Sequence, residues 1–211
     1  MSYDNDDDYF FEGKATDLGK FFFHGDDILY LAPGCFDAAR GQSAVQLLIG
    51  HDESKAYCDT SNHLEIHYGP DAVVFRVRMP ASFKSELDGV AGSFEDYNPV
   101  SIGFKKIRVE KKEIDGAIVQ IIHEAQLSEV SILQSAPALK STYARVVHAS
   151  SCGTLRDDYE SGRFALASQF ISLHRKVAAM DNDDGKVDYV HRTTDYERKA
   201  KAFERALVRL G

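Results

Sequence analysis

The stretch Asn98–Phe104, NPVSIGF, leaves a polar, acidic segment and enters the alternating, strand-like residues 105–109. Ser101 stands at this turn-to-strand junction between a valine and an isoleucine, with a glycine close behind. Its apolar neighbours hold the residue in place while the hydroxyl stays exposed. Most serines at such junctions are structural, and a serine becomes a nucleophile only beside a base. The stretch therefore predicts a strand and makes Ser101 a candidate whose role depends on the rest of the chain.

Short apolar runs of the same kind occur at fairly regular intervals on both sides of this stretch. They are Phe21–Phe23, Ile28–Leu31, Val45–Ile49, His63–His67, Ala72–Met79, Ile102–Val109, Ala117–Ile122 and Gln126–Leu133. This spacing, with few long helical patterns, favours a barrel or sandwich with one or two helices. A helical turn is expected near residues 36–40 and a short helix over residues 83–90. We therefore predict an α+β fold that is mainly β.

After about residue 150 the apolar residues change to helical spacing. A first set comprises Phe164, Ala167, Phe170, Ile171, His174 and Val177, and a second comprises Tyr196, Phe203, Leu207 and Leu210. The acidic residues 181–185 separate the two sets. The sequence thus predicts a disordered acidic tip over residues 1–9, a β-rich body over residues 10–149 and a helical tail over residues 150–211.

Composition limits the classes of function. The 211 residues, 44% of them hydrophobic and 27% charged, are sufficient for one large domain or one domain with an appendage. No apolar run nears the roughly 20 residues that span a bilayer, and no signal segment is evident, so we expect no membrane contact. A net charge of −8 argues against direct nucleic-acid binding, which needs a basic face. Three widely spaced cysteines, Cys35, Cys58 and Cys152, indicate a reducing, intracellular setting.

Two patterns suggest a metal site, and both are weak. His63 and His67 are four residues apart, but the helical metalloprotease motif needs a glutamate directly after its first histidine. Here leucine takes that position, and Glu65 lies on the opposite face if the segment is a strand. Asp181–Gly185 resembles a calcium loop only loosely, because Met180 would be its first ligand. We expect neither a metal nor a cofactor.

Nucleophilic catalysis is the stronger interpretation. His51 follows an apolar run, where a strand delivers side chains to a rim, and an imidazole suits the role of general base. Glu129 lies in a strand-like segment whose alternation would place on one face Leu127, Glu129, Ser131 and Leu133. A carboxylate among leucines is costly to bury unless it is paired, for example with a histidine N–H. Ser101, His51 and Glu129 are thus a candidate triad; a lysine partner for Glu129 and a turn-capping role for His51 are the alternatives.

Four motifs, in order, resemble those of one family. The family's opening motif, GD-I…PG-F, is similar to residues 25–28 with 33–36, and its LL-HD segment is similar to residues 47–52 (LLIGHD). Its SIGF serine motif is similar to residues 100–104 (VSIGF). Its closing motif, L-EVS-V…PA, is similar to residues 127–133 with 137–138. Their order and spacing are similar to those of the tailed-phage prohead (capsid maturation) proteases, which are related to the herpesvirus assemblins. The resemblance covers roughly residues 9–147.

This resemblance implies a serine endopeptidase with a compact antiparallel β-barrel and surrounding helices. Such an enzyme acts in the host cytoplasm, inside the assembling prohead, where it cuts the major capsid protein or a scaffold protein and often itself. It would work as a homo-oligomer, a dimer or higher. Carried over by position, Ser101 would be the nucleophile, His51 the general base and Glu129 the residue that orients and charges the base. The tail over residues 150–211 matches none of the motifs and is expected to be a docking or autocleaved segment.

Two rival functions are a catalytically silent protease fold used as a scaffold and an unrelated small-molecule hydrolase. The presence of all three residue types at matching positions argues against the silent scaffold. The absence of a Gly-x-Ser-x-Gly elbow around Ser101 argues against a hydrolase of the α/β type. If Glu129 pointed away from His51, the third member would be sought among Asp52, His67, His123 and Glu124.

Overall fold

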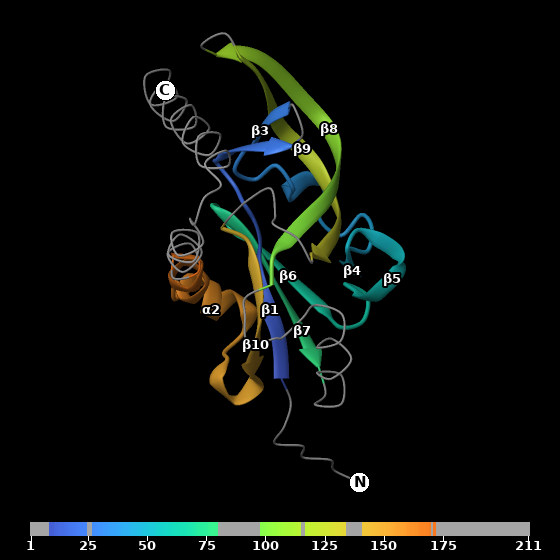
Figure 1. The fold of residues 1–211 in the computed structure, drawn as a ribbon, viewed down its shortest axis with the longest axis vertical. Coiled ribbons are helices and arrows are strands. Elements are labelled where there is room, and N and C mark those ends of the chain that lie inside the picture. The colour runs from blue at the N-terminus through green and yellow to red at the C-terminus, as the bar shows by residue number, and fades with distance from the viewer. Residues whose placement is uncertain are drawn as a thin grey trace, which may run out of the picture.

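The computed structural model describes residues 9–24, 27–79, 98–114, 117–133, 141–169 and 171. These residues form two β-sheets, with a few short helical segments, most of them in the C-terminal part of the chain (Figure 1). The predicted fold class, α+β and mainly β, is confirmed. The helix expected over residues 83–90, the acidic connection 181–185 and the second helix of the tail lie outside the described residues.

The prediction of a closed antiparallel barrel is wrong for the described part of the chain. The strands form two separate open sheets, and strand β9 pairs in parallel with two of its neighbours. Apolar runs at regular intervals predict strands equally well for a barrel and for open sheets, because the pairing of the outermost strands leaves no local signal in the sequence.

The first sheet, sheet A, has the strand order β10-β1-β7-β6, and all its neighbours are antiparallel. Its strands are β1 (Tyr9–Asp17), β6 (Leu64–Tyr68), β7 (Ala72–Met79) and β10 (Tyr143–His148). Both faces are covered. Phe11, Phe75 and Ala144 belong to the main core, whereas Val74 and Tyr143 pack against the C-terminal helical residues.

The second sheet, sheet B, has the order β2-β3-β9-β4-β5, with β8 paired to β9 as well. Its strands are β2 (Phe21–His24), β3 (Asp27–Leu31), β4 (Gln46–Ile49), β5 (Asp52–Asp59), β8 (Val100–Ile114) and β9 (Ala117–Ile132). The long strand β9 unites two apolar runs that the sequence predicts as separate strands. It pairs in parallel with β3 and β4 and antiparallel with β8, so it connects the whole sheet.

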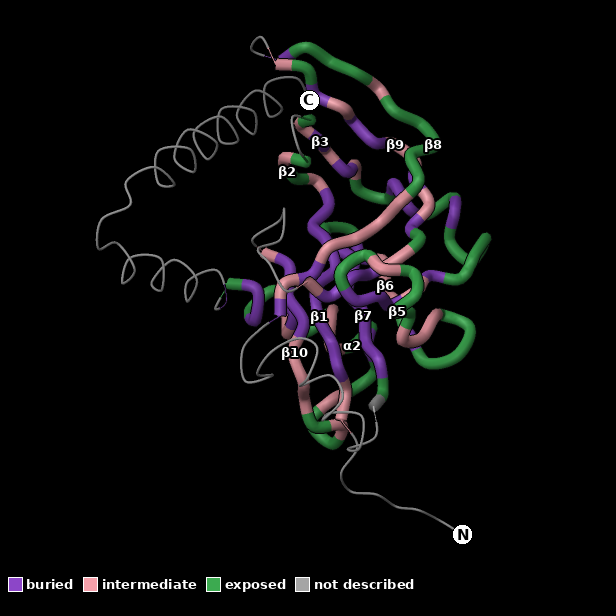
Figure 2. The backbone as a smooth tube through the Cα atoms, turned by 45° about the vertical axis from the view of Figure 1, so that its right-hand side comes forward, coloured by how far each residue is buried: buried purple, intermediate pink, exposed green. Residues whose placement is uncertain are grey.

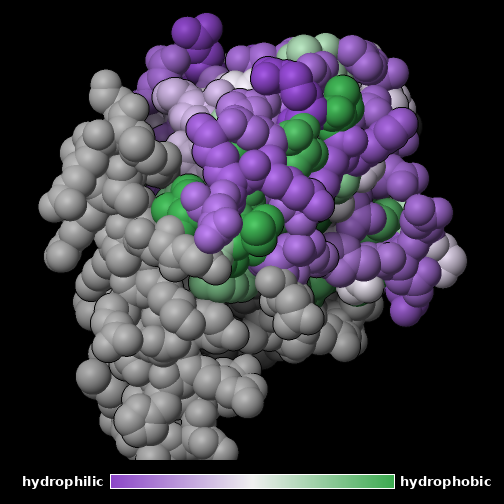
Figure 3. Space-filling view, turned by 90° about the horizontal axis from the view of Figure 1, so that it is seen from above, coloured by the Kyte–Doolittle hydropathy of each residue, from purple (hydrophilic) through white to green (hydrophobic). Residues whose placement is uncertain are grey.

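The β8–β9 hairpin extends away from sheet A, at the top of Figure 1. In Figure 2, much of β8 is exposed, whereas the strands at the centre of sheet A are mostly buried. Seen from the hairpin end, the described surface is mainly hydrophilic, with apolar groups set among the polar ones (Figure 3).

The described helical segments are short. They are the 3-10 helices η1 (Asp37–Ala39) and η2 (Ala149–Ser151), the α-helix α2 (Leu155–Glu160), and a helical stretch over residues 163–169. Phe164, Ala167 and Ile171 of the first predicted amphipathic helix are buried against sheet A. Among the described helices, none has the length and apolarity that a bilayer crossing requires.

Candidate active site

His51 is presented by a tight turn between β4 and β5. Gly50 and His51 are the two residues of this turn, and both have positive φ angles, 65° and 62°. Such angles are typical of type I′ hairpin turns and are uncommon for residues other than glycine. The Gly50 N–H donates a hydrogen bond to the Ile132 carbonyl of β9 at 2.8 Å. The turn is therefore fixed to the central strand of sheet B, and His51 with it.

A β-bulge at Ser128 decides which way Glu129 faces. Gly103 on β8 is paired with Glu129, but the next residue, Phe104, is paired with Leu127, so Ser128 is an extra residue. The Ser128 hydroxyl donates to the Gly103 carbonyl at 2.8 Å. An extra residue shifts the alternation by one position, so Leu127 joins the main core while Glu129 does not. The prediction that Leu127 and Glu129 share one face is therefore wrong.

Glu129 meets His51. Nδ1 of His51 and Oε1 of Glu129 are in hydrogen-bond contact. The Ser131 hydroxyl donates to the same carboxylate oxygen at 3.0 Å. The Glu129 side chain is 14% exposed and that of His51 is 44% exposed, so the carboxylate is shielded while the imidazole is open to solvent.

Ser101 lies on β8, across from the same part of β9. It is directly opposite Ser131, and Gly103 two residues further on is opposite Glu129. Directly opposed residues of an antiparallel pair have their side chains on the same face of the sheet. The side chains of Ser101, Ser131 and Glu129 therefore share one face of sheet B, and Ser101 is partly exposed on it.

The residues before Ser101 bind to both sheets. Asn98 exchanges two backbone hydrogen bonds with Ala144 of β10, at 2.9 and 2.8 Å. The Pro99 carbonyl accepts a hydrogen bond from the Leu133 N–H at 2.9 Å. The start of β8 is thus held at the junction of sheets A and B, which fixes the backbone that carries Ser101.

Gly103 leaves room for the Glu129 carboxylate. A Cβ atom built on Gly103 would lie 2.5 Å from Cγ, 2.7 Å from Cδ and 2.9 Å from Oε1 of Glu129. A Cβ atom essentially never lies this close to an atom to which it is not bonded, so the Glu129 side chain lies in space that any residue larger than glycine would fill.

The four alternative third members of the triad have other neighbours. Asp52 accepts hydrogen bonds from Ser54, the His67 ring packs against Tyr159, His123 contacts Glu110, and Glu124 lies near Arg108.

Two cysteines are also poor candidates for a nucleophile. Burial raises the pKa of the Cys35 thiol to about 12, with a further contribution from Asp37, and burial likewise raises the pKa of Cys58 to about 12.

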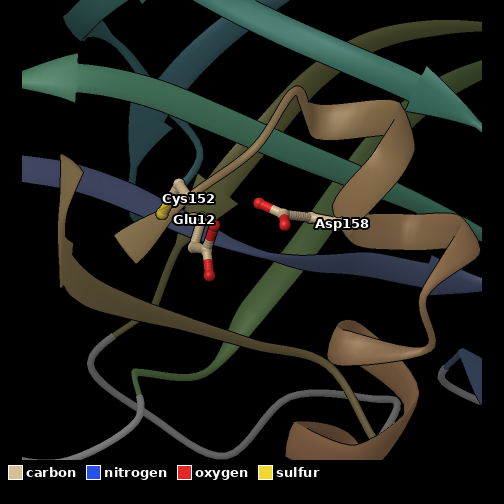
Figure 4. Close-up of side chains that lie close together, drawn as sticks. All are labelled: Glu12, Cys152 and Asp158. Carbon is tan, nitrogen blue, oxygen red and sulfur yellow. The ribbon is translucent and has the colours of Figure 1, made fainter. Parts of the chain in front are cut away.

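A second cluster, which the sequence reasoning missed, lies between sheet A and α2. Carboxylate oxygens of Glu12 and Asp158 and the sulfur of Cys152 lie within 4.8 Å of one another (Figure 4). The carboxylates are bound by guanidinium groups: Arg76 contacts both of them, Arg163 lies 3.0 Å from Glu12 and 3.3 Å from Asp158, and Arg145 lies 3.0 Å from Glu12.

Three guanidinium groups around two carboxylates oppose the binding of a metal cation. We therefore interpret this cluster, the Glu12–Arg76 network, as a structural set of ion pairs. Glu12, Arg76 and Asp158 are far apart in the sequence, and no local motif marks them.

The residue types and their arrangement point to one class of protein. An exposed histidine whose ring contacts a shielded carboxylate, on a sheet that carries a partly exposed serine, has the components of a serine hydrolase. The sequence profile of the caudovirus prohead serine proteases matches residues 11–156, and the chain belongs to this family. The family recognised from the four motifs is therefore confirmed. A comparison with curated proteins found no match. Membership assigns the chain to the serine peptidases of the phage prohead.

Proposed function

We propose that this protein is a serine endopeptidase that cleaves the major capsid protein or a scaffold protein during prohead maturation, and its own chain as well. Family membership supports serine peptidase chemistry in the prohead. The observation that carries the proposal is the contact between His51 Nδ1 and Glu129 Oε1, on the sheet face toward which Ser101 is directed.

The proposed catalytic triad is Ser101, His51 and Glu129. Because Nδ1 of His51 faces Glu129, Nε2 is the nitrogen available for the proton of the Ser101 hydroxyl. As that proton moves to Nε2, Oγ forms a bond to the carbonyl carbon of the substrate peptide. The imidazolium then donates the proton to the departing amine as the C–N bond breaks, which leaves an acyl-enzyme. Water, deprotonated by the same imidazole, hydrolyses the ester and restores the serine.

Glu129 has two roles in this scheme. Its carboxylate keeps the proton of the neutral imidazole on Nδ1 and stabilises the imidazolium that forms during the transfer. The shielding of Glu129 strengthens this interaction, because charges interact more strongly where water is excluded. The open position of His51 leaves the other ring nitrogen accessible to a peptide.

The proposed setting is the assembling prohead in the host cytoplasm, with the enzyme as a homo-oligomer. The substrate would be an extended segment of the capsid or scaffold protein. The oligomeric state is testable by light scattering of the purified full-length chain; a monomer at micromolar concentration would contradict it.

The activity is tested by co-expressing the chain with the capsid protein of the same phage. We expect the wild type to shorten the capsid protein, as measured by intact mass, and Ser101→Ala to leave it at full length. Ser61→Ala, which changes an exposed serine whose hydroxyl donates to Asp59, is the matched control and should process like the wild type. Equal processing by wild type and Ser101→Ala would refute the protease proposal and favour the silent scaffold.

The nucleophile can also be identified without knowing the cleavage site. A fluorophosphonate probe phosphonylates an activated serine and releases fluoride. We expect mass spectrometry of the labelled full-length chain to place the adduct on Ser101. An adduct at another serine, or none, would contradict the assignment of the nucleophile.

A further inference from the structure

Ser131 is a buried hydroxyl residue at the centre of the proposed site. Its exposed fraction is 0%, and it lies on β9 between the buried apolar residues Val130 and Ile132. On one side it is paired with Ser101 of β8, and on the other with Leu48 of β4, three residues before His51. Ser131 therefore lies next to the strand that carries the proposed nucleophile and next to the strand that leads to the proposed base.

The hydroxyl of Ser131 contacts the catalytic carboxylate directly. It donates to Oε1 of Glu129 at 3.0 Å, and the same oxygen accepts from Nδ1 of His51. Two donors on one oxygen restrict the rotation of the carboxylate more than a single donor does. A hydrogen bond from a neutral donor to a charged acceptor is also stronger than one between neutral groups.

Packing alone does not explain a serine at this position. A buried hydroxyl without a partner is destabilising, so a site filled only for packing favours an apolar residue of similar size. The face of β9 that lies in the main core is filled in that way, by Leu127, Val130 and Ile132. Ser131 is on the other face, and its hydroxyl is satisfied by Glu129.

We infer that Ser131 is a positioning residue that holds the Glu129 carboxylate against His51 Nδ1. This inference rests on the proposed function, because it assigns a role within the Ser101–His51–Glu129 triad. Ser131 acts through Glu129 and does not itself contact the substrate.

The test compares full-length variants in their reaction with the fluorophosphonate probe. Ser131→Ala removes the hydroxyl, and Ser131→Thr retains it. The rate constant of labelling at Ser101 reports the chemistry, whereas the final extent of labelling reports the fraction of folded protein. We expect Ser131→Ala to reach the wild-type extent with a rate constant about 10- to 100-fold lower. Ser131→Thr should restore the rate to within about threefold of the wild type.

Ser168→Ala is the matched control. Ser168 is also buried, and its hydroxyl makes one hydrogen bond, to the Ser141 carbonyl at 2.9 Å. If the Thr methyl does not fit, Ser131→Cys is a second test of the lost hydroxyl: it keeps the shape of serine but is a weak donor, so it should label slowly while the melting temperature stays close to that of the wild type. If Ser131→Ala is labelled with the wild-type rate constant, the inference is overturned. It is also overturned if only the final extent of labelling falls and the rate constant of labelling does not.

A second measurement separates this inference from the proposed function. In ¹⁵N-histidine NMR spectra, we expect His51 of the wild type to show one tautomer, protonated at Nδ1, and His51 of Ser131→Ala to show exchange between tautomers. This readout does not depend on activity. Failure of the wild type to label at Ser101 would refute the protease proposal alone; an unchanged His51 spectrum in Ser131→Ala would refute the role of Ser131 alone.

Discussion

At the scale of single residues, the lack of a side chain at Gly103 is required for the geometry of the proposed site. Because a Cβ at this position would overlap Cγ and Cδ of Glu129, we expect Gly103→Ala to displace the carboxylate from His51 while β8 stays paired with β9. The rate constant of fluorophosphonate labelling should fall by about 100-fold or more, since a misplaced triad member removes most of its contribution. Circular dichroism would verify that the fold is retained.

Gly153→Ala provides the comparison for that substitution. A Cβ on Gly153 would lie no closer than 3.5 Å to its neighbours, which is ordinary van der Waals contact, so labelling should stay within about twofold of the wild type. Wild-type labelling by Gly103→Ala would mean that Glu129 needs no such space and would contradict the geometry described for the carboxylate.

The sequence predicts the residue types of the proposed triad, but not all of the neighbours that surround them. Ser101, His51 and Glu129 are found as residue types within ordered motifs, and the contact of His51 with Glu129 agrees with the expectation of a histidine partner for the carboxylate. The expectation that Glu129 shares its face with Leu127 is wrong, because the bulge at Ser128 places the two side chains on opposite faces of β9. The alternation predicts Ser131 on the same face as Glu129, but its hydrogen bond to the carboxylate depends on the side-chain rotamers of both residues, which the sequence pattern does not indicate.

At the scale of elements, the Glu12–Arg76 network joins α2 to sheet A. Arg76 of β7 is almost completely buried and binds Glu12 of β1 and Asp158 of α2. Removing Arg76 takes away the guanidinium that contacts both carboxylates and leaves them with Arg145 and Arg163 alone, and breaking a buried ion-pair network is costly. We expect Arg76→Met to lower the free energy of unfolding by about 3 kcal/mol, measured by urea denaturation.

Arg156→Met is the control for Arg76→Met. Arg156 is exposed and pairs with Glu160 one turn along α2, so its replacement should change the free energy of unfolding by less than about 0.5 kcal/mol. Equal effects of the two substitutions would show that burial of the network contributes nothing to stability.

The same network predicts sensitivity to acid. Burial by itself would raise the pKa of Asp158, but hydrogen bonds from Arg76 and from the Gly153 N–H outweigh it, and the pKa of this carboxyl is lowered from its ordinary 3.8. A carboxyl with a lower pKa in the folded state stabilises the fold above its unfolded pKa and loses this effect as the pH falls through the folded pKa.

We therefore expect the difference in unfolding free energy between the wild type and Asp158→Asn to be largest above about pH 5 and to shrink below about pH 4. Urea denaturation of both proteins across this range measures it. A difference that is constant with pH would contradict the lowered pKa of Asp158.

At the scale of the whole molecule, residues of the C-terminal segment complete a second core. Val74 and Tyr143 of sheet A are buried under Leu155, Phe164, Ala167 and Ile171. A chain that ends at residue 153 loses these partners and also Asp158 of the Glu12–Arg76 network. We expect it to unfold with a free energy at least about 5 kcal/mol below that of a chain that ends at residue 171, because several large apolar side chains are removed.

The two truncated chains differ only by residues 154–171, so their comparison isolates this packed segment. Equal melting temperatures would contradict its role in the second core. Incorporation of both chains into proheads, compared with that of the full-length chain, tests the docking function expected for residues 150–211.

Strand content follows from the sequence where strands are apolar and short. The predicted runs correspond to β2, β3, β4, β6 and β7 and to parts of β8 and β9. Strand β5 was not predicted, because Asp52–Asp59 is polar and largely exposed, and an exposed edge strand carries little hydrophobic pattern. The union of two runs into β9 was missed as well, because His123 and Glu124 interrupt the apolar pattern while cross-strand pairing with β8 continues.

The sequence by itself determined the fold class, the family and the residue types of the proposed triad, because these depend on local pattern and on ordered motifs. Only the tertiary structure decided that the sheets are open, that a bulge at Ser128 turns Glu129 toward His51, and that Ser131 binds the same carboxylate. It also brought Arg76 to two carboxylates that are far from it in the chain. The physical reason is that register and pairing between distant strands arise from packing of the whole chain, which no short segment contains.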